Sequence, residues 1–169
     1  MKKIGTLASG EAVWELPGSH LKDHPTVLPA LPEALGKISS DNRETIVEEV
    51  DLGRVVGENI RVKTTDADEI VYARRPGRAG HTRFVKNRRP EPCTRVVAIL
   101  HRLESGDYAI ATAFIGTRCP AEPWDTRWAT EESLPFWRAH ALVWGEAEVV
   151  PGTETTECPW EACKEEKEK

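Results

Sequence analysis

Residues 94–116 contain the feature that most narrows the possible folds, namely two apolar segments separated by a short polar turn. The segments are TRVVAILHRL (94–103) and YAIATAFIG (108–116), and the turn between them contains Gly106. Their β-branched residues and the glycine turn predict two antiparallel strands joined as a hairpin. Because both faces of this hairpin are mostly apolar, we expect it at the centre of a sheet.

The tight turn also predicts the register of this hairpin. With a loop of two or four residues, His101 lies opposite Ile110, and Ile99 lies opposite Thr112. Further strands are predicted for short segments rich in β-branched residues and bounded by Gly, Pro, Asp or Asn, at 46–51, 59–64, 69–74 and 82–86. Residues 4–16 alternate around a turn and predict another hairpin.

Two segments favour helices. In 25–36, apolar residues recur at helical spacing between Pro25, which suits a first turn, and Gly36, which suits an end. The segment ATEESLPFWRAH predicts a short helix, and ALVWGEAEVV after it predicts a strand. We therefore expect an α+β fold with an N-terminal helical portion packed on an antiparallel sheet. The expected boundaries are a single domain over 1–157, with its sheet at about 45–150, and a charged tail over 158–169.

Composition sets the broad class of the protein. With 169 residues, 39% hydrophobic and 30% charged, the chain is typical of one soluble globular domain. It has no apolar run of about 18 residues, and its first sixteen residues lack the apolar core of a signal peptide. We therefore expect a cytoplasmic protein with no membrane partner. Four cysteines at these spacings suit neither a disulfide framework nor a zinc site, so no metal or cofactor is expected.

The segment ARRPGRAGHTRFVKNRRP (73–90) is basic in an otherwise acidic chain. It has seven Arg or Lys, one His and no acidic residue, although the net charge of the chain is −5. Such segregation produces a local positive potential that can concentrate an anionic ligand. A structural alternative is a charged strand edge that repels unwanted pairing, or cations that pair with Glu-rich segments. The candidate nucleic-acid-binding residues are Arg74, Arg75, Arg78, Arg88 and Arg89.

The same segment carries groups that could cleave RNA without a metal. Glycines around Arg78 allow close approach to a phosphate, whose oxygens match the planar guanidinium. Cleavage needs a base for the 2′-hydroxyl proton, cations for the phosphate charge and an acid for the leaving 5′-oxygen. His81, after a glycine-rich turn, and His140, where a helix gives way to a strand, are candidates for proton transfer. His101 lies in an apolar strand and is better explained as a core residue.

The segments HTRFVKNR, TRVVAILHRL, YAIATAFIG and FWRAHALVW, in this order, resemble the barnase–EndoU–colicin–RelE (BECR) superfamily of small bacterial and phage proteins. The resemblance covers roughly residues 45–147. It implies a curved antiparallel sheet and a metal-independent ribonuclease, often a toxin, with His, Arg, Lys and Thr or Ser across the concave face. The implied catalytic residues are His81, Arg83, Lys86, Thr112 and His140. The chain has no closely spaced His/Glu pair of the barnase kind.

We therefore expect an RNA-cleaving protein that uses the 2′-hydroxyl as nucleophile. His81 or His140 would transfer protons, Arg83 and Lys86 would stabilise the phosphate, and Thr112 would orient it. One alternative is a non-catalytic module that binds RNA or a protein through residues 73–90. Another is an immunity or antitoxin type of protein, because an acidic chain suits a basic toxin partner.

Overall fold

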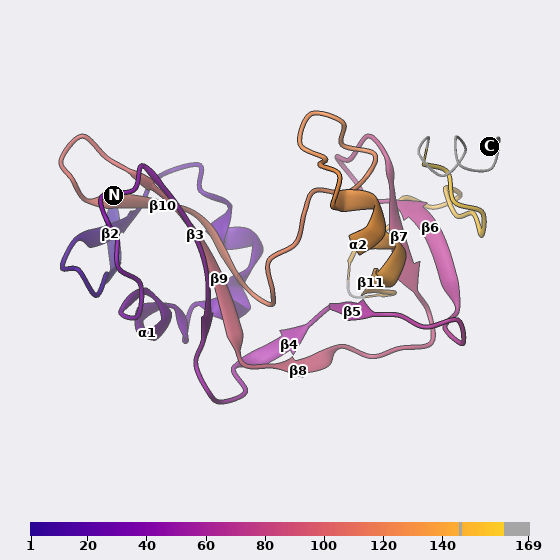
Figure 1. Cartoon of the computed structure of the whole chain (residues 1–169), viewed down its shortest axis with the longest axis horizontal. Coiled ribbons are helices and arrows are strands. Elements are labelled where there is room, and N and C mark those ends of the chain that lie inside the picture. Colours follow the sequence, from indigo (N-terminus) through magenta and orange to yellow (C-terminus); the bar gives the residue numbers. More distant parts are fainter. Residues whose placement is uncertain (146, 161–169) are drawn as a thin grey trace. The chain divides into compact units, whose positions relative to one another are not determined.

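The computed structural model describes residues 1–145 and 147–160 (Figure 1). Strands account for 35% of the described residues and helices for 12%. The chain divides into two compact units: unit 1 comprises Met1–Asn59 and Pro92–Arg118, and unit 2 comprises Ile60–Glu91 and the described part of Cys119–Lys169. Each unit has its own sheet, so each is described by itself.

Unit 1 contains a five-stranded sheet in the order β1-β2-β10-β9-β3. Its strands are β1 (Lys2–Thr6), β2 (Ala12–Glu15), β3 (Thr45–Asp51), β9 (Arg95–Arg102) and β10 (Tyr108–Ile115). Strands β9 and β10 pair antiparallel in the middle of this sheet, so the predicted central hairpin is confirmed. The N-terminal hairpin of β1 and β2 is also confirmed, and β2 joins the sheet by pairing parallel to β10.

The predicted register of the central hairpin holds over half its length. Ile99 pairs with Thr112 as predicted, but His101 pairs with Ala109 rather than with Ile110. The register shifts between Ile110 and Thr112, where β10 has one residue more than β9. The half that differs lies beside the turn, where the amide of Leu103 donates to the carbonyl oxygen of Asp107, and the bulge then restores the predicted register.

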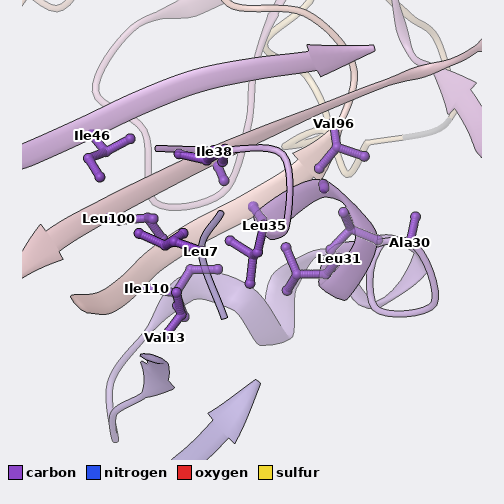
Figure 2. Close-up of a cluster of buried hydrophobic side chains, with 14 of the residues drawn as sticks. Leu7, Val13, Ala30, Leu31, Leu35, Ile38, Ile46, Val96, Leu100 and Ile110 are labelled. Carbon is purple, nitrogen blue, oxygen red and sulfur yellow. The ribbon is translucent and has the colours of Figure 1, made fainter. Parts of the chain in front are cut away.

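The predicted N-terminal helical portion is wrong. The N-terminal residues supply two strands, and the helical part is reduced to three short pieces: η1 (His20–Asp23), η2 (Pro25–Val27) and α1 (Leu31–Leu35). Proline explains the interruption, because Pro29 lacks an amide hydrogen and cannot continue the hydrogen bonding of a helix. The short pieces still contribute to the core of unit 1, where Leu31 and Leu35 belong to the same buried cluster as Leu100 (Figure 2).

Unit 2 contains a four-stranded sheet in the order β5-β11-β7-β6. Its elements are β5 (Arg61–Lys63), β6 (Ile70–Arg74), β7 (His81–Val85), α2 (Ser133–Ala139) and β11 (His140–Val143). The predicted late helix and the strand after it are confirmed as α2 and β11.

A separate two-stranded sheet pairs β4 (Gly57–Asn59) with β8 (Glu91–Cys93). The described residues thus form three sheets, which corrects the expected α+β fold with one sheet covered by helices.

The expected domain over 1–157 and tail over 158–169 remain a prediction. Most of that tail, 161–169, lies outside the described residues, and so does Cys163. Cys93 and Cys119 are free thiols. None of the described helices has the length and apolar character needed to cross a membrane.

Candidate nucleic-acid interface

Residues 60–91 form a basic part of unit 2. They supply β5, β6 and β7, and they carry nine Arg and Lys against four Asp and Glu, a formal charge of +5. The rest of the chain carries fourteen against twenty-four, a charge of −10. The segment 73–90 accounts for the whole of this excess, because the remaining residues of 60–91 add two cations, Arg61 and Lys63, and all four acids.

The pairing of β6 with β7 places two predicted residues on one face of the sheet. Directly paired residues share a face, and Tyr72 pairs with Arg83 while Arg74 pairs with His81. We call these four residues the Arg83 face. Successive residues of a strand alternate, so Thr82 and Phe84 lie on the opposite face.

His140 lies on that opposite face. Leu142 of β11 pairs with Phe84, and His140 is two residues before Leu142. His140 in turn pairs with Lys63, and Leu142 pairs with Arg61. We call Arg61, Lys63 and His140 the His140 face. His81 and His140 therefore lie on opposite faces, and they cannot act as acid and base on one phosphate.

Arg83 reaches His140 only through the backbone. Its Nη1 donates to Thr64 Oγ1 at 2.8 Å and to the carbonyl oxygen of His140 at 3.1 Å. Its Nε is buried and has no hydrogen-bond partner among the described residues. Burial also raises the pKa of the neighbouring Tyr72 phenol. The Arg83 guanidinium therefore hydrogen-bonds to the backbone at the start of β11, on the face of the sheet opposite to the His140 ring.

Each of the two histidine rings donates one N–H to a backbone carbonyl oxygen. His81 Nε2 lies 3.1 Å from the carbonyl oxygen of Thr153 and must donate to it, so this nitrogen is occupied. His140 Nδ1 lies 2.9 Å from the carbonyl oxygen of Phe136 and donates there. Since a neutral imidazole carries one proton, Nε2 of His140 is the proton acceptor. The same argument makes Nδ1 of His81 an acceptor, so the two rings differ in their neighbours instead: the His140 ring stacks on Phe136 and shares its face with Arg61 and Lys63.

Two further cations belong to the His140 site, although they lie outside the predicted set. Lys63 is the direct cross-strand neighbour of His140 and is exposed. The Arg61 guanidinium carbon lies 5.8 Å from the centroid of the Phe136 ring, which stacks on His140. The sequence signal was the alternation of cation, apolar residue and cation in 61–63, which puts both cations on one face.

Two of the predicted nucleic-acid-binding residues form ion pairs inside unit 2. Arg75 Nη2 lies 2.8 Å from Glu122 Oε2, and Arg75 Nε donates to Thr82 Oγ1 at 3.2 Å. Arg88 Nη1 lies 3.1 Å from Asp68 Oδ2, and Arg88 Nη2 lies 3.5 Å from Glu91. Arg75 and Arg88 therefore fit the structural alternative, in which basic residues pair with acidic residues of the same protein.

The other predicted cations are exposed. Lys86 Nζ lies over the ring of Trp144, 4.8 Å from its centroid, which joins a cation and an aromatic ring on the surface. Arg74 Nη2 donates to the carbonyl oxygen of Arg78 at 2.7 Å. Arg78 and Arg89 are exposed and form no ion pair with another described residue. These side chains have charge available for a ligand.

Thr112 does not belong to unit 2. It lies in β10 of unit 1, whereas the other four predicted catalytic residues belong to unit 2. Its Oγ1 is buried and has no hydrogen-bond partner in the described part of the chain. Within the same part of the chain, no three His, Cys, Asp or Glu side chains are grouped closely enough to hold a metal ion.

Comparison of the chain with models of protein families, with characterised proteins and with solved structures finds no match. The resemblance to the BECR superfamily therefore remains a prediction.

Proposed function

We propose that unit 2 binds the phosphate backbone of RNA. The observation that carries the proposal is the charge of +5 on residues 60–91 in a chain whose total charge is −5. Five cations of this part are exposed: Lys63, Arg74, Arg78, Lys86 and Arg89. Exposed Lys and Arg bind nucleic acid by neutralising phosphates and releasing their counterions. The acidic remainder of the chain weakens binding to polyanions elsewhere on its surface.

Single-stranded RNA suits this surface better than duplex DNA. Readers of the DNA major groove commonly insert a helix, but α1 has five residues and α2 has seven. The Trp137 side chain of α2 is also buried, so it is not available to contact DNA. Surfaces that bind single strands combine cations with aromatic side chains, and Lys86 and Trp144 bring one of each together in unit 2.

The salt dependence of RNA binding tests the proposal. Binding of a labelled single-stranded RNA of about 12 nucleotides is measured by fluorescence anisotropy between about 50 and about 200 mM salt. We expect Arg78→Ala and Lys86→Ala each to weaken binding and to flatten the logarithmic salt slope by about 0.7 per lost contact. Lys22→Ala, an exposed cation of unit 1, is the matched control. Slopes equal to that of the parent in both variants contradict the proposal.

Metal-independent cleavage of the bound RNA is a second candidate function, favoured by the fixed orientation of His140. Its Nε2 would take the proton from a 2′-hydroxyl, and the 2′-oxygen would attack the adjacent phosphorus. The bond from phosphorus to the 5′-oxygen would break, and the imidazolium would return the proton to that oxygen. Lys63 and Arg61 would stabilise the negative charge on the phosphate oxygens. The products would be a 2′,3′-cyclic phosphate and a 5′-hydroxyl.

A further inference from the structure

Trp128 is the exposed tryptophan of this chain. Its side chain is 69% exposed, whereas Trp normally buries a large apolar area. The other five are buried or engaged: Trp137 and Trp160 are 3% exposed, Trp144 lies under Lys86, Trp14 donates to Asp107, and Trp124 packs against Gly80. Of the six indoles, that of Trp128 is therefore the one most open to a ligand, and the residues around it indicate which ligand it suits.

The loop that carries Trp128 is held in one conformation by its own backbone. The amide of Asp125 donates to the carbonyl oxygen of Glu122 at 3.0 Å. The amides of Trp128 and Ala129 both donate to the carbonyl oxygen of Asp125, at 3.0 and 2.8 Å. Because these backbone hydrogen bonds already restrict the turn, Trp128 loses little conformational entropy when it binds a ligand.

Two contacts join this loop to the basic loop between β6 and β7. Gly80 lies so close to the indole of Trp124 that a Cβ at that position would overlap the ring. Arg75 and Glu122 form an ion pair at 2.8 Å, with side chains 23% and 10% exposed. The exposed Arg78 lies in the same basic loop, between these two anchor points. The Trp128 loop is therefore fixed beside a source of positive charge.

We propose that Trp128 stacks on an unpaired base of single-stranded RNA, while Arg78 and Arg127 contact the neighbouring phosphates. Arg127 is 83% exposed, and its Nε lies 3.9 Å from Asp125, so the guanidinium is largely free to bind a phosphate. Aromatic stacking requires an open base face, which a duplex offers only at its ends. The inference rests on the proposed function and specifies its substrate as a strand with unpaired bases.

Two probes separate base stacking from phosphate binding. One is a single-stranded oligouridylate of about 12 nucleotides, and the other is an abasic strand of the same length and charge. We expect the parent protein to bind the oligouridylate more tightly than the abasic strand. Trp128→Ala should weaken oligouridylate binding by about 5-fold to about 150-fold and leave binding of the abasic strand unchanged. Trp128→Phe should restore most of the affinity, whereas Trp128→Leu should not.

Each other outcome has a distinct meaning. If Trp128→Leu binds oligouridylate as tightly as Trp128→Phe does, an apolar contact rather than stacking is at work, and the inference is overturned. If the parent binds both probes equally, the inference fails while RNA binding through phosphates stands. If the parent binds neither probe, the proposed function fails as well. Leu28→Ala, at an apolar residue of unit 1 that is 47% exposed, is the control expected to change nothing.

Discussion

The imidazole of His140 stacks on the phenyl ring of Phe136, with 4.0 Å between the ring centroids and 6° between the planes. The same two residues are joined by the hydrogen bond from Nδ1 to the Phe136 carbonyl oxygen. Phe136 precedes His140 by one helical turn, so α2 determines both the tautomer and the plane of the ring. Nε2 is thereby presented in a fixed direction, which a proton-transfer group requires.

If the protein cleaves RNA, His140 and not His81 should be responsible. His140→Ala should lower the cleavage rate by about 10²–10⁴-fold, the usual contribution of a positioned proton-transfer group. His81→Ala should have a much smaller effect, because His81 lies on the face of the sheet opposite to His140, Arg61 and Lys63. The rate is measured from the appearance of 2′,3′-cyclic phosphate ends, with RNA binding measured in parallel.

His81→Ala is thus the matched control for His140→Ala. DNA of the same sequence should be inert because it lacks the 2′-hydroxyl, and a chelator should leave the rate unchanged. Equal rate losses in the two variants would contradict a site centred on His140. A parent protein that cleaves no RNA in a panel of structured and single-stranded substrates removes the cleavage candidate, and RNA binding is then left to stand on its own test.

Substitution of threonine by valine should have opposite effects on the free energy of unfolding at Thr112 and at Thr82. Valine is β-branched like threonine, with a methyl group in place of the hydroxyl. Thr112 Oγ1 is buried with no hydrogen-bond partner among described residues, so Thr112→Val should raise the free energy of unfolding by up to about 1 kcal/mol. Thr82 Oγ1 accepts from Arg75 Nε, so Thr82→Val should lower it by about 1–2 kcal/mol. Urea denaturation measures both, and a less stable Thr112→Val protein contradicts the first expectation.

Gly80 should tolerate no side chain, in contrast to Gly36. In Gly80→Ala the added methyl overlaps the indole of Trp124, and relieving that overlap should cost about 1–3 kcal/mol of unfolding free energy. In Gly36→Ala the methyl meets the carbonyl oxygens of Pro32 and Glu33 at an ordinary 3.5 Å, and φ is −65°. This control should be neutral or stabilising by up to about 1 kcal/mol. Equal denaturation midpoints for the two variants would mean that the Trp124 loop moves freely.

Local patterns predicted most of the strands but not their partners. The β9–β10 hairpin was predictable because its strands are adjacent in sequence and the turn between them brings them together. The pairing of β2 with β10, and of β7 with β11, joins segments far apart in the chain, and their alternation does not specify a partner. Without these two pairings, the division into separate sheets could not be derived. The helical spacing of residues 25–36 was misleading because prolines interrupt it.

For the candidate site, too, local patterns predicted the spacing within a strand but not the pairing between distant strands. That His81 and Arg83 share a face was implicit in their spacing of two residues. That His140 lies on the opposite face depends on the parallel register of Leu142 with Phe84, which no local signal encodes. Arg61 and Lys63 could have been identified from their alternation in 61–63, whereas the ion pair of Arg75 with Glu122 depends on the course of a loop.

Tyr72 provides a test of the interior of unit 2 through its ionisation. It is 8% exposed, pairs with Arg83 across the strands, and packs edge-on against Trp160 with 5.3 Å between ring centroids. Burial disfavours the phenolate and raises the pKa of Tyr72 above the ordinary value of 10.0. The folded protein therefore keeps this proton at a pH where the unfolded chain has lost it. The resulting stabilisation is complete below about pH 10 and is lost as pH rises through the folded-state pKa.

The chain has two tyrosines, so each can be followed separately. In Tyr108→Phe the absorbance change on phenolate formation reports Tyr72 alone, and its midpoint should lie above pH 10 while the protein remains folded. In Tyr72→Phe the free energy of unfolding should fall less steeply than in the parent as pH rises above about 10, because this group no longer contributes to the proton difference. Circular dichroism at each pH confirms that the protein is folded. A midpoint at or below 10 in folded Tyr108→Phe would mean that water reaches the Tyr72 hydroxyl and that β6 is not closed over by Trp160.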